Sequence, residues 1–304
     1  MDPTRMWIGF VVLVLALLAF DMGVFHRRKR AITIGRALWM TAFWVALAVA
    51  FNVVIWRVKG PRAAVEFLTG YLVEESLSVD NLFVFLLVFT YFAVPPRLQH
   101  GVLFWGIVGA MAMRLLFIVA GIALIQRLHW VVYVFGAFLV VTGLRLARRE
   151  EKRIDPEKNP IVRLVRRFAR ITDGYREGRF VVRDGRGLAF TPLFVVLLVV
   201  ETTDLVFAVD SIPAVLAITR DPFIVYTSNV FAILGLRALY FALSGMMERF
   251  HLLRYGLAVI LAFTGVKMLL SEHVPIPAWI ALAVIVATLA ASAAASLAWP
   301  KREP

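Results

Sequence analysis

The sequence contains no cysteine and few charged residues. Among its 304 residues cysteine is absent, and Asp, Glu, Lys and Arg together make up 17%. Without cysteine the chain can form no disulfide and offers neither a thiolate metal ligand nor a cysteine nucleophile. It also lacks a Gly-rich phosphate loop, a Ser/His/Asp arrangement and a nucleotide-binding motif, so nothing in the sequence indicates an enzyme or a resident cofactor.

Hydrophobic residues, in contrast, make up 61% of the chain, well above the roughly 45–50% of a soluble domain. They form runs of about 20 residues, the length that a helix needs to cross a bilayer about 30 Å thick. The first run does not resemble a signal peptide, because no basic region leads into it and no small-residue cleavage site follows it. The sequence therefore predicts an all-α, polytopic membrane helix bundle. About nine transmembrane helices are expected, at 6–25, 37–56, 67–92, 101–125, 129–147, 189–217, 223–245, 252–270 and 276–298.

The longest polar stretch, 148–188, is rich in arginine and is the only sizeable segment expected outside the bilayer. We therefore expect one membrane domain over residues 1–304, in which 6–56 forms two flanking helices and 276–298 a final helix. Anionic lipid headgroups could bind the arginine-rich loop, although the usual enrichment of basic residues in cytoplasmic loops predicts such a loop by itself.

Basic residues are divided unevenly between the two sides of the predicted bundle. Of the 33 Lys and Arg residues, 24 fall in segments on one side, 7 in segments on the other and 2 within helices. Because cytoplasmic loops are enriched in Lys and Arg, this asymmetry predicts an outside N-terminus and a cytoplasmic C-terminus in a bacterial inner membrane. It also accounts for the net charge of +13 without a nucleic-acid partner.

Two three-helix segments, 67–147 and 189–270, resemble each other. An odd number of helices makes the second copy enter the bilayer from the opposite face, which is the inverted-repeat plan of many secondary transporters. In these proteins the binding site lies near the midplane, where the copies meet. The matches are Arg127-Leu128-His129 with Arg249-Phe250-His251, Thr142-Gly143 with Thr264-Gly265, Arg114 with Arg237, and Asp80 with either Asp210 or Asp204.

Six carboxylates fall inside the third and sixth predicted helices, and two arginines fall inside the fourth and seventh. A charged group at a helix centre costs roughly 2.5–3.5 kcal/mol on insertion scales, so such groups usually line a polar pathway. Ion pairs with the two arginines would leave four acids unpaired, which favours cation handling over a purely structural role. Glu74 and Glu75 could instead lie near the outer interface. The six acids are Glu74, Glu75, Asp80, Glu201, Asp204 and Asp210, and the arginines are Arg114 and Arg237.

The spacing of the acids predicts how a site could form. Asp204 and Asp210 are six residues apart, or about 9 Å along an unbroken helix, so one ion cannot contact both. We expect a break at Pro213, which lacks an N–H and leaves the carbonyl of Val209 without its helical partner. This carbonyl would then join Asp210 and Ser211 as a ligand.

Asp80 and Asn81 would bring matching oxygens from the other copy. Such oxygen ligands suit Mg²⁺, Ca²⁺ and Mn²⁺. The five histidines all lie near predicted helix ends and are expected to be interfacial or solvated. Asp21, near the inner end of the first helix, is expected to pair with Arg27 or Arg28.

Several motifs make the sequence similar to the TerC/Alx family, named for tellurium resistance. The resemblance covers about residues 7–272 and implies a multi-helix membrane protein of the LysE transporter superfamily that exports Mn²⁺. In the family the position of Glu75 is often basic, so this residue is not taken as a ligand. The motifs are Glu74-Glu75-Ser76-Leu77-Ser78-Val79-Asp80-Asn81-Leu82-Phe83-Val84-Phe85, Gln99-His100, Val102-Leu103-Phe104-Trp105-Gly106, Phe207-Ala208-Val209-Asp210-Ser211-Ile212-Pro213, Thr227-Ser228-Asn229 and Gly235-Leu236-Arg237-Ala238.

Together these patterns predict a divalent-cation exporter, with Mn²⁺ as the expected cargo rather than a cofactor. Glu201 is expected to be a second-shell group or proton carrier, and Arg114 and Arg237 to be gating counter-charges. A non-transporting membrane scaffold and a Ca²⁺/H⁺ exchanger remain alternatives, and no oligomeric state is predicted. The expected metal ligands are Glu74, Asp80, Asn81, Asp204, Asp210 and Ser211.

Overall fold

The computed structural model of the chain describes residues 2–26, 34–128, 130–148, 170–172, 174–184, 187–243, 252–270 and 276–299. Helices dominate this part of the chain, which confirms the predicted all-α membrane bundle. Nine α-helices of 17 residues or more lie within it: α1 (Pro3–His26), α2 (Ile34–Lys59), α3 (Pro61–Tyr91), α4 (Pro96–Arg127), α5 (Val131–Arg148), α7 (Pro192–Leu216), α8 (Pro222–Leu243), α9 (Leu253–Leu269) and α10 (Ala278–Ala298).

Seven of these helices are long and apolar enough to cross a membrane. The two others in the described part of the chain are α3, which carries the acidic residues of the first copy, and α9, which has only 17 residues. A total of nine transmembrane helices therefore stays a prediction, although the predicted bounds agree with the observed ones within a few residues.

Prolines begin several of the helices. Pro61, Pro96 and Pro192 occupy the first turn of α3, α4 and α7, where a missing N–H removes no helical hydrogen bond. The turn between α2 and α3 is a single residue, Gly60, with a φ of +91°, a conformation that glycine adopts without steric cost. Proline at the helix starts and glycine in the turn thus allow the chain to reverse direction sharply between long apolar helices.

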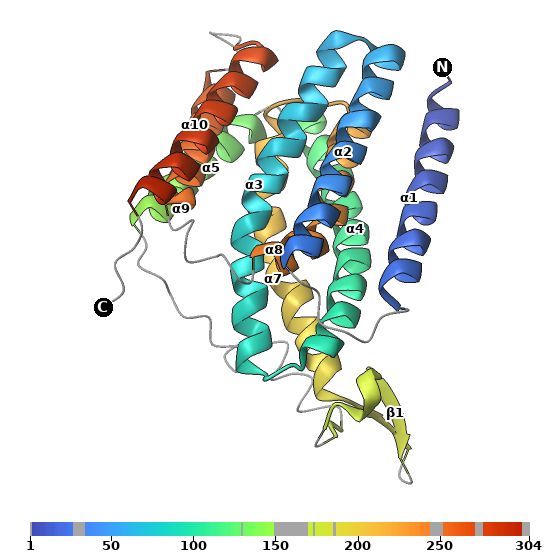
Figure 1. Cartoon of the computed structure of the whole chain (residues 1–304). Coiled ribbons are helices and arrows are strands. Elements are labelled where there is room, and N and C mark those ends of the chain that lie inside the picture. The colour runs from blue at the N-terminus through green and yellow to red at the C-terminus, as the bar shows by residue number, and fades with distance from the viewer. Residues whose placement is uncertain are drawn as a thin grey trace.

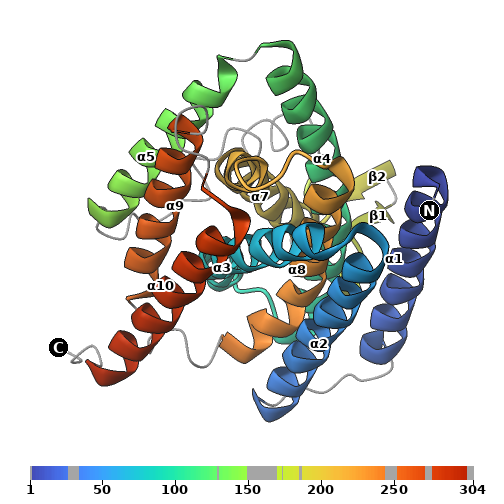
Figure 2. The ribbon, with the colours of Figure 1, turned by 90° about the horizontal axis from the view of Figure 1, so that it is seen from above.

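Four helices, α3, α4, α7 and α8, form the centre of the bundle. The helix α3 packs against both α7 and α8, and α4 packs against the same two helices. Figure 1 shows the turn between α2 and α3 at the top, which we call the α2–α3 end, and the β-hairpin at the bottom, which we call the hairpin end. The view from above places α1 and α2 along one side of this centre and α10 on another (Figure 2).

The packing of the two three-helix segments is reciprocal. Contacts of α3 with α8 correspond to contacts of α7 with α4, and α5 packs against α9. Two copies related by a pseudo-twofold axis would pack in this way. The inverted repeat itself stays a prediction.

The pair α5 and α9 approaches closely through glycines. A Cβ added at Gly143 would lie 2.6 Å from the backbone oxygen of Ala258, and one at Gly265 would lie 2.6 Å from that of Gly136. Small residues at such interfaces let helix backbones pack tightly in a bilayer, where hydrophobic attraction between helices is weak. This pair flanks the centre and leaves the polar groups of α3, α4, α7 and α8 facing one another.

A short β-hairpin, which the sequence analysis did not predict, precedes α7. Strand β1 (Val181–Asp184) pairs with β2 (Gly187–Phe190) in antiparallel register. The predicted start of this helix, residue 189, is too early, because the chain stays extended to Phe190 and turns into the helix at Pro192. The hairpin lies below the start of α7 in Figure 1.

Candidate cation site

Arg114 is fully buried in the middle of α4, where it contacts three other central helices. Its Nη1 donates hydrogen bonds to Glu74 Oε1 on α3, to Ser211 Oγ on α7 (3.2 Å) and to Asn229 Oδ1 on α8 (2.6 Å). Its Nη2 pairs with Asp204 Oδ1 on α7 at 3.4 Å. We call Arg114, Glu74, Asp204, Ser211 and Asn229 the Arg114 cluster.

The hydrogen bonding of the cluster is incomplete, and one guanidinium faces two carboxylates. The donors Arg114 Nε and Asn229 Nδ2 are buried without partners. Nη1 carries two hydrogens but lies within hydrogen-bond distance of three oxygens. Glu74 Oε2 and Asp204 Oδ2 are buried with no hydrogen-bond partner. Such groups are uncommon, because an unsatisfied polar atom loses its hydration without compensation. Two carboxylates thus share one guanidinium, and each retains an unoccupied oxygen.

Further unpartnered oxygens follow Glu74 along α3. Ser78 Oγ and Asn81 Oδ1 are buried and have no hydrogen-bond partner, and these residues lie four and seven positions after Glu74. Residues at i, i+4 and i+7 share one side of a helix. The side of α3 that contacts Arg114 therefore carries three oxygens that lack partners.

The corresponding side of α7 is also polar. Glu201, Asp204 and Ser211 lie at positions that share one side of this helix. The carboxyl group of Glu201 rests against α4 where Gly109 has no side chain, and a Cβ added there would collide with it. Glu201 Oε2 is buried without a hydrogen-bond partner. Gly109 therefore provides the space for a carboxylate one turn from Asp204.

The side chains of Asp80 and Asp210 lie outside the described residues, although their backbones belong to α3 and α7. Among the His, Asp and Glu side chains that the structure does describe, no group of three is arranged to hold a metal ion. The pairing of Asp80 with Asp210 therefore stays a prediction. The described residues bring together Glu74, Asp204 and Ser211, all around Arg114.

Arg237 has a different partner from Arg114. It forms a buried ion pair with Asp21 on α1 and also donates to the Asp21 backbone oxygen at 3.3 Å. The sequence predicts a pair of Asp21 with Arg27 or Arg28, which lie outside the described residues. It did not predict the pair with Arg237, whose role as a counter-charge for the site stays a prediction.

Glu74 is 1% exposed and Glu75 Oε2 is buried without a hydrogen-bond partner, while a position of these acids near the outer membrane interface stays a prediction. The expected break at Pro213 is wrong, because the helix α7 continues through Pro213 to Leu216. One proline near a helix end removes a single hydrogen bond, and the rest of the last turn holds the helical backbone together.

Asn229 is a site residue that the sequence analysis quoted in a motif but gave no role. It is completely buried, as are its neighbours Thr227 and Ser228. Three consecutive polar residues in a helix with few other polar groups were the available signal, because buried polar side chains need partners. The partner of Asn229, Arg114 on α4, could not be identified without the fold.

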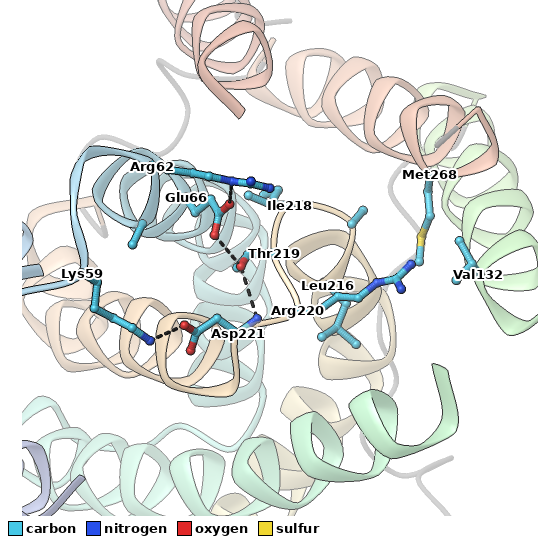
Figure 3. A pocket seen from close by; sticks show the side chains of 12 residues that line it. Lys59, Arg62, Glu66, Val132, Leu216, Ile218, Thr219, Arg220, Asp221 and Met268 are labelled. Carbon is cyan, nitrogen blue, oxygen red and sulfur yellow. Dashed lines mark hydrogen bonds and ion pairs between the residues drawn. The ribbon is translucent and has the colours of Figure 1, made fainter. Parts of the chain in front are cut away.

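A separate cavity of about 570 Å³ lies at the α2–α3 end (Figure 3). Both of its carboxylates have partners: Asp221 pairs with Lys59, and Glu66 pairs with Arg62 and accepts a hydrogen bond from Thr219 Oγ1 at 2.7 Å. None of the residues of the Arg114 cluster lines this cavity. This cavity is thus distinct from the unsatisfied carboxylates of the cluster.

Comparison with known proteins places these features in a wider group. The family described as "Integral membrane protein TerC family" matches residues 59–304. A protein of Myxococcus xanthus named "Uncharacterized membrane protein STKORF319" is 46% identical over 301 residues, which cover 98% of this chain and 94% of that protein.

Two further relatives carry the name "Putative membrane-bound redox modulator Alx". The one from Salmonella typhi is 47% identical and that from Escherichia coli (strain K12) 46% identical, with 92% of this chain and 90% of each relative covered. No solved structure matches the chain.

Proposed function

Because the chain belongs to the TerC family of integral membrane proteins, we propose that it exports divalent cations, with Mn²⁺ as the main cargo. The observation that carries this proposal is the unsatisfied Arg114 cluster, in which Glu74 Oε2 and Asp204 Oδ2 are buried without partners. A divalent cation would supply the missing positive charge and accept both oxygens as ligands.

The proposed site lies between the polar sides of α3 and α7. The cation contacts Glu74, Asp204 and Ser211, whose side chains meet at Arg114. Because ligands six residues apart on an unbroken helix lie about 9 Å apart, it contacts Asp80, Asn81 and Asp210 at other points of its pathway along α3 and α7. Carboxylate, amide and hydroxyl oxygens favour Mn²⁺, Mg²⁺ and Ca²⁺ over metals that select thiolate ligands. The resemblance to the TerC/Alx family favours Mn²⁺ among these ions.

Arg114 acts as the counter-charge in this mechanism. Without a cation, its guanidinium holds one oxygen of each carboxylate, so the acids do not face each other unscreened in the bilayer. When the cation binds, it displaces the guanidinium from the two carboxylates, and Asn229 Oδ1 continues to accept from Nη1. Release of the cation returns Arg114 to both acids. Glu201, beside Gly109, receives or delivers a proton during this exchange.

The name of the Alx relatives refers to redox modulation. This chain contains no cysteine, so any such effect cannot use a thiol of its own. A transporter that sets the amount of a redox-active metal ion would influence cellular redox balance without a redox-active side chain. The proposed export of Mn²⁺ is consistent with that name.

Flux of Mn²⁺ into proteoliposomes containing the purified full-length chain tests the proposal. Wild-type protein should move Mn²⁺, whereas Asp204→Asn, which keeps the size of the side chain but removes its charge, should abolish most of the flux. Glu66→Gln is a matched control, because Glu66 lies on α3 at the cavity and has partners there. A wild-type chain that moves no metal would support a membrane scaffold, and flux of Ca²⁺ alone would support a Ca²⁺ exchanger.

The proposed sidedness, with the N-terminus outside and the C-terminus in the cytoplasm, can be tested by cysteine labelling. The natural chain has no cysteine, so there is no background. Lys59 is the last residue of α2, next to the turn into α3, and Ala93 lies in the turn after α3. A cysteine at Lys59 should react with an impermeant reagent in intact cells, and cysteines at Ala93 and Glu177 should be protected. The reverse pattern would invert the proposed topology.

A further inference from the structure

The helix α1 lies at the edge of the bundle, beside α2 (Figures 1 and 2). Its large side chains Ile8, Val12 and Leu15 are each about 60% exposed, as expected for a helix that faces lipid. Its inner side contributes Phe10, which packs against Phe223 of α8. The family match begins at residue 59, so α1 lies outside the segment that defines the family.

An ion pair joins this outer helix to the family core. The side chains of Asp21 and Arg237 are 6% and 3% exposed. Arg237 lies within the matched segment on α8, whereas its carboxylate partner lies on α1. The charge of a buried core arginine is thus balanced by a helix outside the matched segment.

Arg237 lies near the depth of the proposed cation ligands. On α8, Asn229 contacts Arg114, and Arg237 follows eight residues later, about 12 Å along the helix. On α3, Glu74 contacts Arg114, and Asn81 follows seven residues later, about 10 Å along. Since α3 and α8 both start at the α2–α3 end and pack together, Arg237 and Asn81 lie at similar depths.

We propose that Asp21 is a positioning residue that holds the Arg237 guanidinium on α1 and so keeps this positive charge from the carboxylates of the cation site. The inference rests on the proposed cation transport and extends it, because it makes α1 a determinant of cation affinity. In a medium of low dielectric constant a guanidinium that loses one carboxylate partner interacts more strongly with other carboxylates nearby. Arg237 released from Asp21 competes with the cation for those ligands.

Three variants of the full-length chain separate this role from a merely structural one. Asp21→Asn releases the Arg237 charge, Arg237→Gln removes it, and the double variant leaves a neutral pair of similar shape. Equilibrium binding of Mn²⁺ to protein in lipid nanodiscs gives the affinity, and thermal unfolding of the same samples gives the stability. Mn²⁺ flux into proteoliposomes is measured for the same three variants.

We expect Asp21→Asn to weaken Mn²⁺ binding about tenfold or more, because a positive charge near the site in a low dielectric opposes the cation. Arg237→Gln should bind Mn²⁺ as tightly as the wild type or more tightly. The double variant should recover wild-type affinity within about threefold, since the interaction of the two residues is removed from both sides at once. If the ion pair of Asp21 and Arg237 were only structural, the variants would change the unfolding temperature but would not show this order of Mn²⁺ affinities.

The inference is overturned if Asp21→Asn binds Mn²⁺ normally, or if the double variant is as impaired as Asp21→Asn. Should Asp21→Asn not fold, Arg237→Gln and the double variant decide: binding equal to or tighter than wild type supports the inference, and clearly weaker binding in both contradicts it. A wild-type chain that neither binds nor moves Mn²⁺ overturns the proposed function, and this inference with it. Normal Mn²⁺ binding by both the wild type and Asp21→Asn overturns only the inference.

Discussion

The Arg114 cluster and the cavity at the α2–α3 end both combine carboxylates with arginine or lysine, but they differ in how completely these groups are satisfied. In the cavity, Asp221 and Glu66 have partners, and the Lys59–Asp221 pair is about one third exposed. In the cluster, Glu74 and Asp204 are almost inaccessible and each has a buried oxygen without a partner. The cavity therefore has open volume and carboxylates with partners, whereas the Arg114 cluster has carboxylate oxygens without partners.

Burial determines which difference matters for function. Ion pairs at a surface contribute about 0–1 kcal/mol, because water screens both charges. A buried charge without a full complement of partners costs several kcal/mol, so a chain that keeps one gains something in return. The proposed cation binding would account for two such carboxylates, whereas the acids of the cavity already have partners.

The largest effect on stability is expected from Arg114→Gln. This change leaves Glu74 and Asp204 without a positively charged partner among the described side chains. Breaking a buried pair from one side typically costs about 3–5 kcal/mol, so the thermal unfolding temperature in detergent should fall sharply. Mn²⁺ should restore part of the loss, because a ligand present at about 100 times its Kd stabilises the folded state by about 2.7 kcal/mol.

Arg62→Gln is the matched control for this variant, because the Arg62 side chain is 91% exposed and pairs with a cavity carboxylate. Its stability should change by less than about 1 kcal/mol and should respond to Mn²⁺ as the wild type does. If Mn²⁺ stabilises neither Arg114→Gln nor the wild type, the unsatisfied carboxylates are not a cation site.

The next largest effect concerns Asp80 and Asp210, the predicted pair of ligands. Replacing either by Asn removes one negative charge in a low-dielectric site and should weaken Mn²⁺ binding by about tenfold or more. The double variant should be little worse than either single variant, because one site is lost once. Binding to membrane-inserted protein gives these values, and normal affinity in both single variants would show that the paired-aspartate site is elsewhere.

The helices were predictable because the bilayer sets their length. A run of about 20 apolar residues has few alternatives in a membrane, and the prolines that begin α3, α4 and α7 sharpen the ends. The hairpin was missed, although Gly185-Arg186, the two residues between the paired Asp184 and Gly187, carry glycine at the first position of a two-residue turn, which is a recognised hairpin signal. The arginine-rich segment around it has no clear periodicity, and Ala189 and Phe190 extend the apolar run of α7 backwards.

The candidate site was predictable in part. Carboxylates inside apolar helices can be recognised in the sequence as candidate site residues, because each is costly to insert into a membrane. Their partners cannot be recognised in this way. Asp21 and Arg237, for example, are separated by 216 residues, and their contact depends on how the helices pack. The burial of Glu75 Oε2 was not predictable for the same reason: the sequence alone does not determine which side of α3 meets its neighbours.

A moderate effect is expected from Gly109→Ala, which tests the space that α4 leaves for Glu201. The added methyl group would occupy the position of the Glu201 carboxyl, a flexible group that can move aside. Transport should therefore slow several-fold, while equilibrium Mn²⁺ binding at Glu74 and Asp204 should stay near the wild-type value. Gly101→Ala on the same helix meets nothing within 4 Å and should leave both unchanged. Equal flux in the two variants would remove Glu201 from the mechanism.

The smallest effects are expected in the cavity, where Lys59→Gln and Asp221→Ala break the same ion pair from its two sides. Lys59→Gln should cost less than about 1 kcal/mol, because the pair is partly exposed. Asp221→Ala should cost about 0.5–2 kcal/mol, since Asp221 Oδ1 also accepts hydrogen bonds from the N–H groups of Phe223 (2.9 Å) and Ile224 (3.3 Å) at the start of α8. Thermal unfolding should show this order, and the Kd for Mn²⁺ should be the same in both variants. Clearly weaker Mn²⁺ binding in Lys59→Gln would place the cavity within the cation site, because an exposed pair distant from the Arg114 cluster has no other means of changing its affinity.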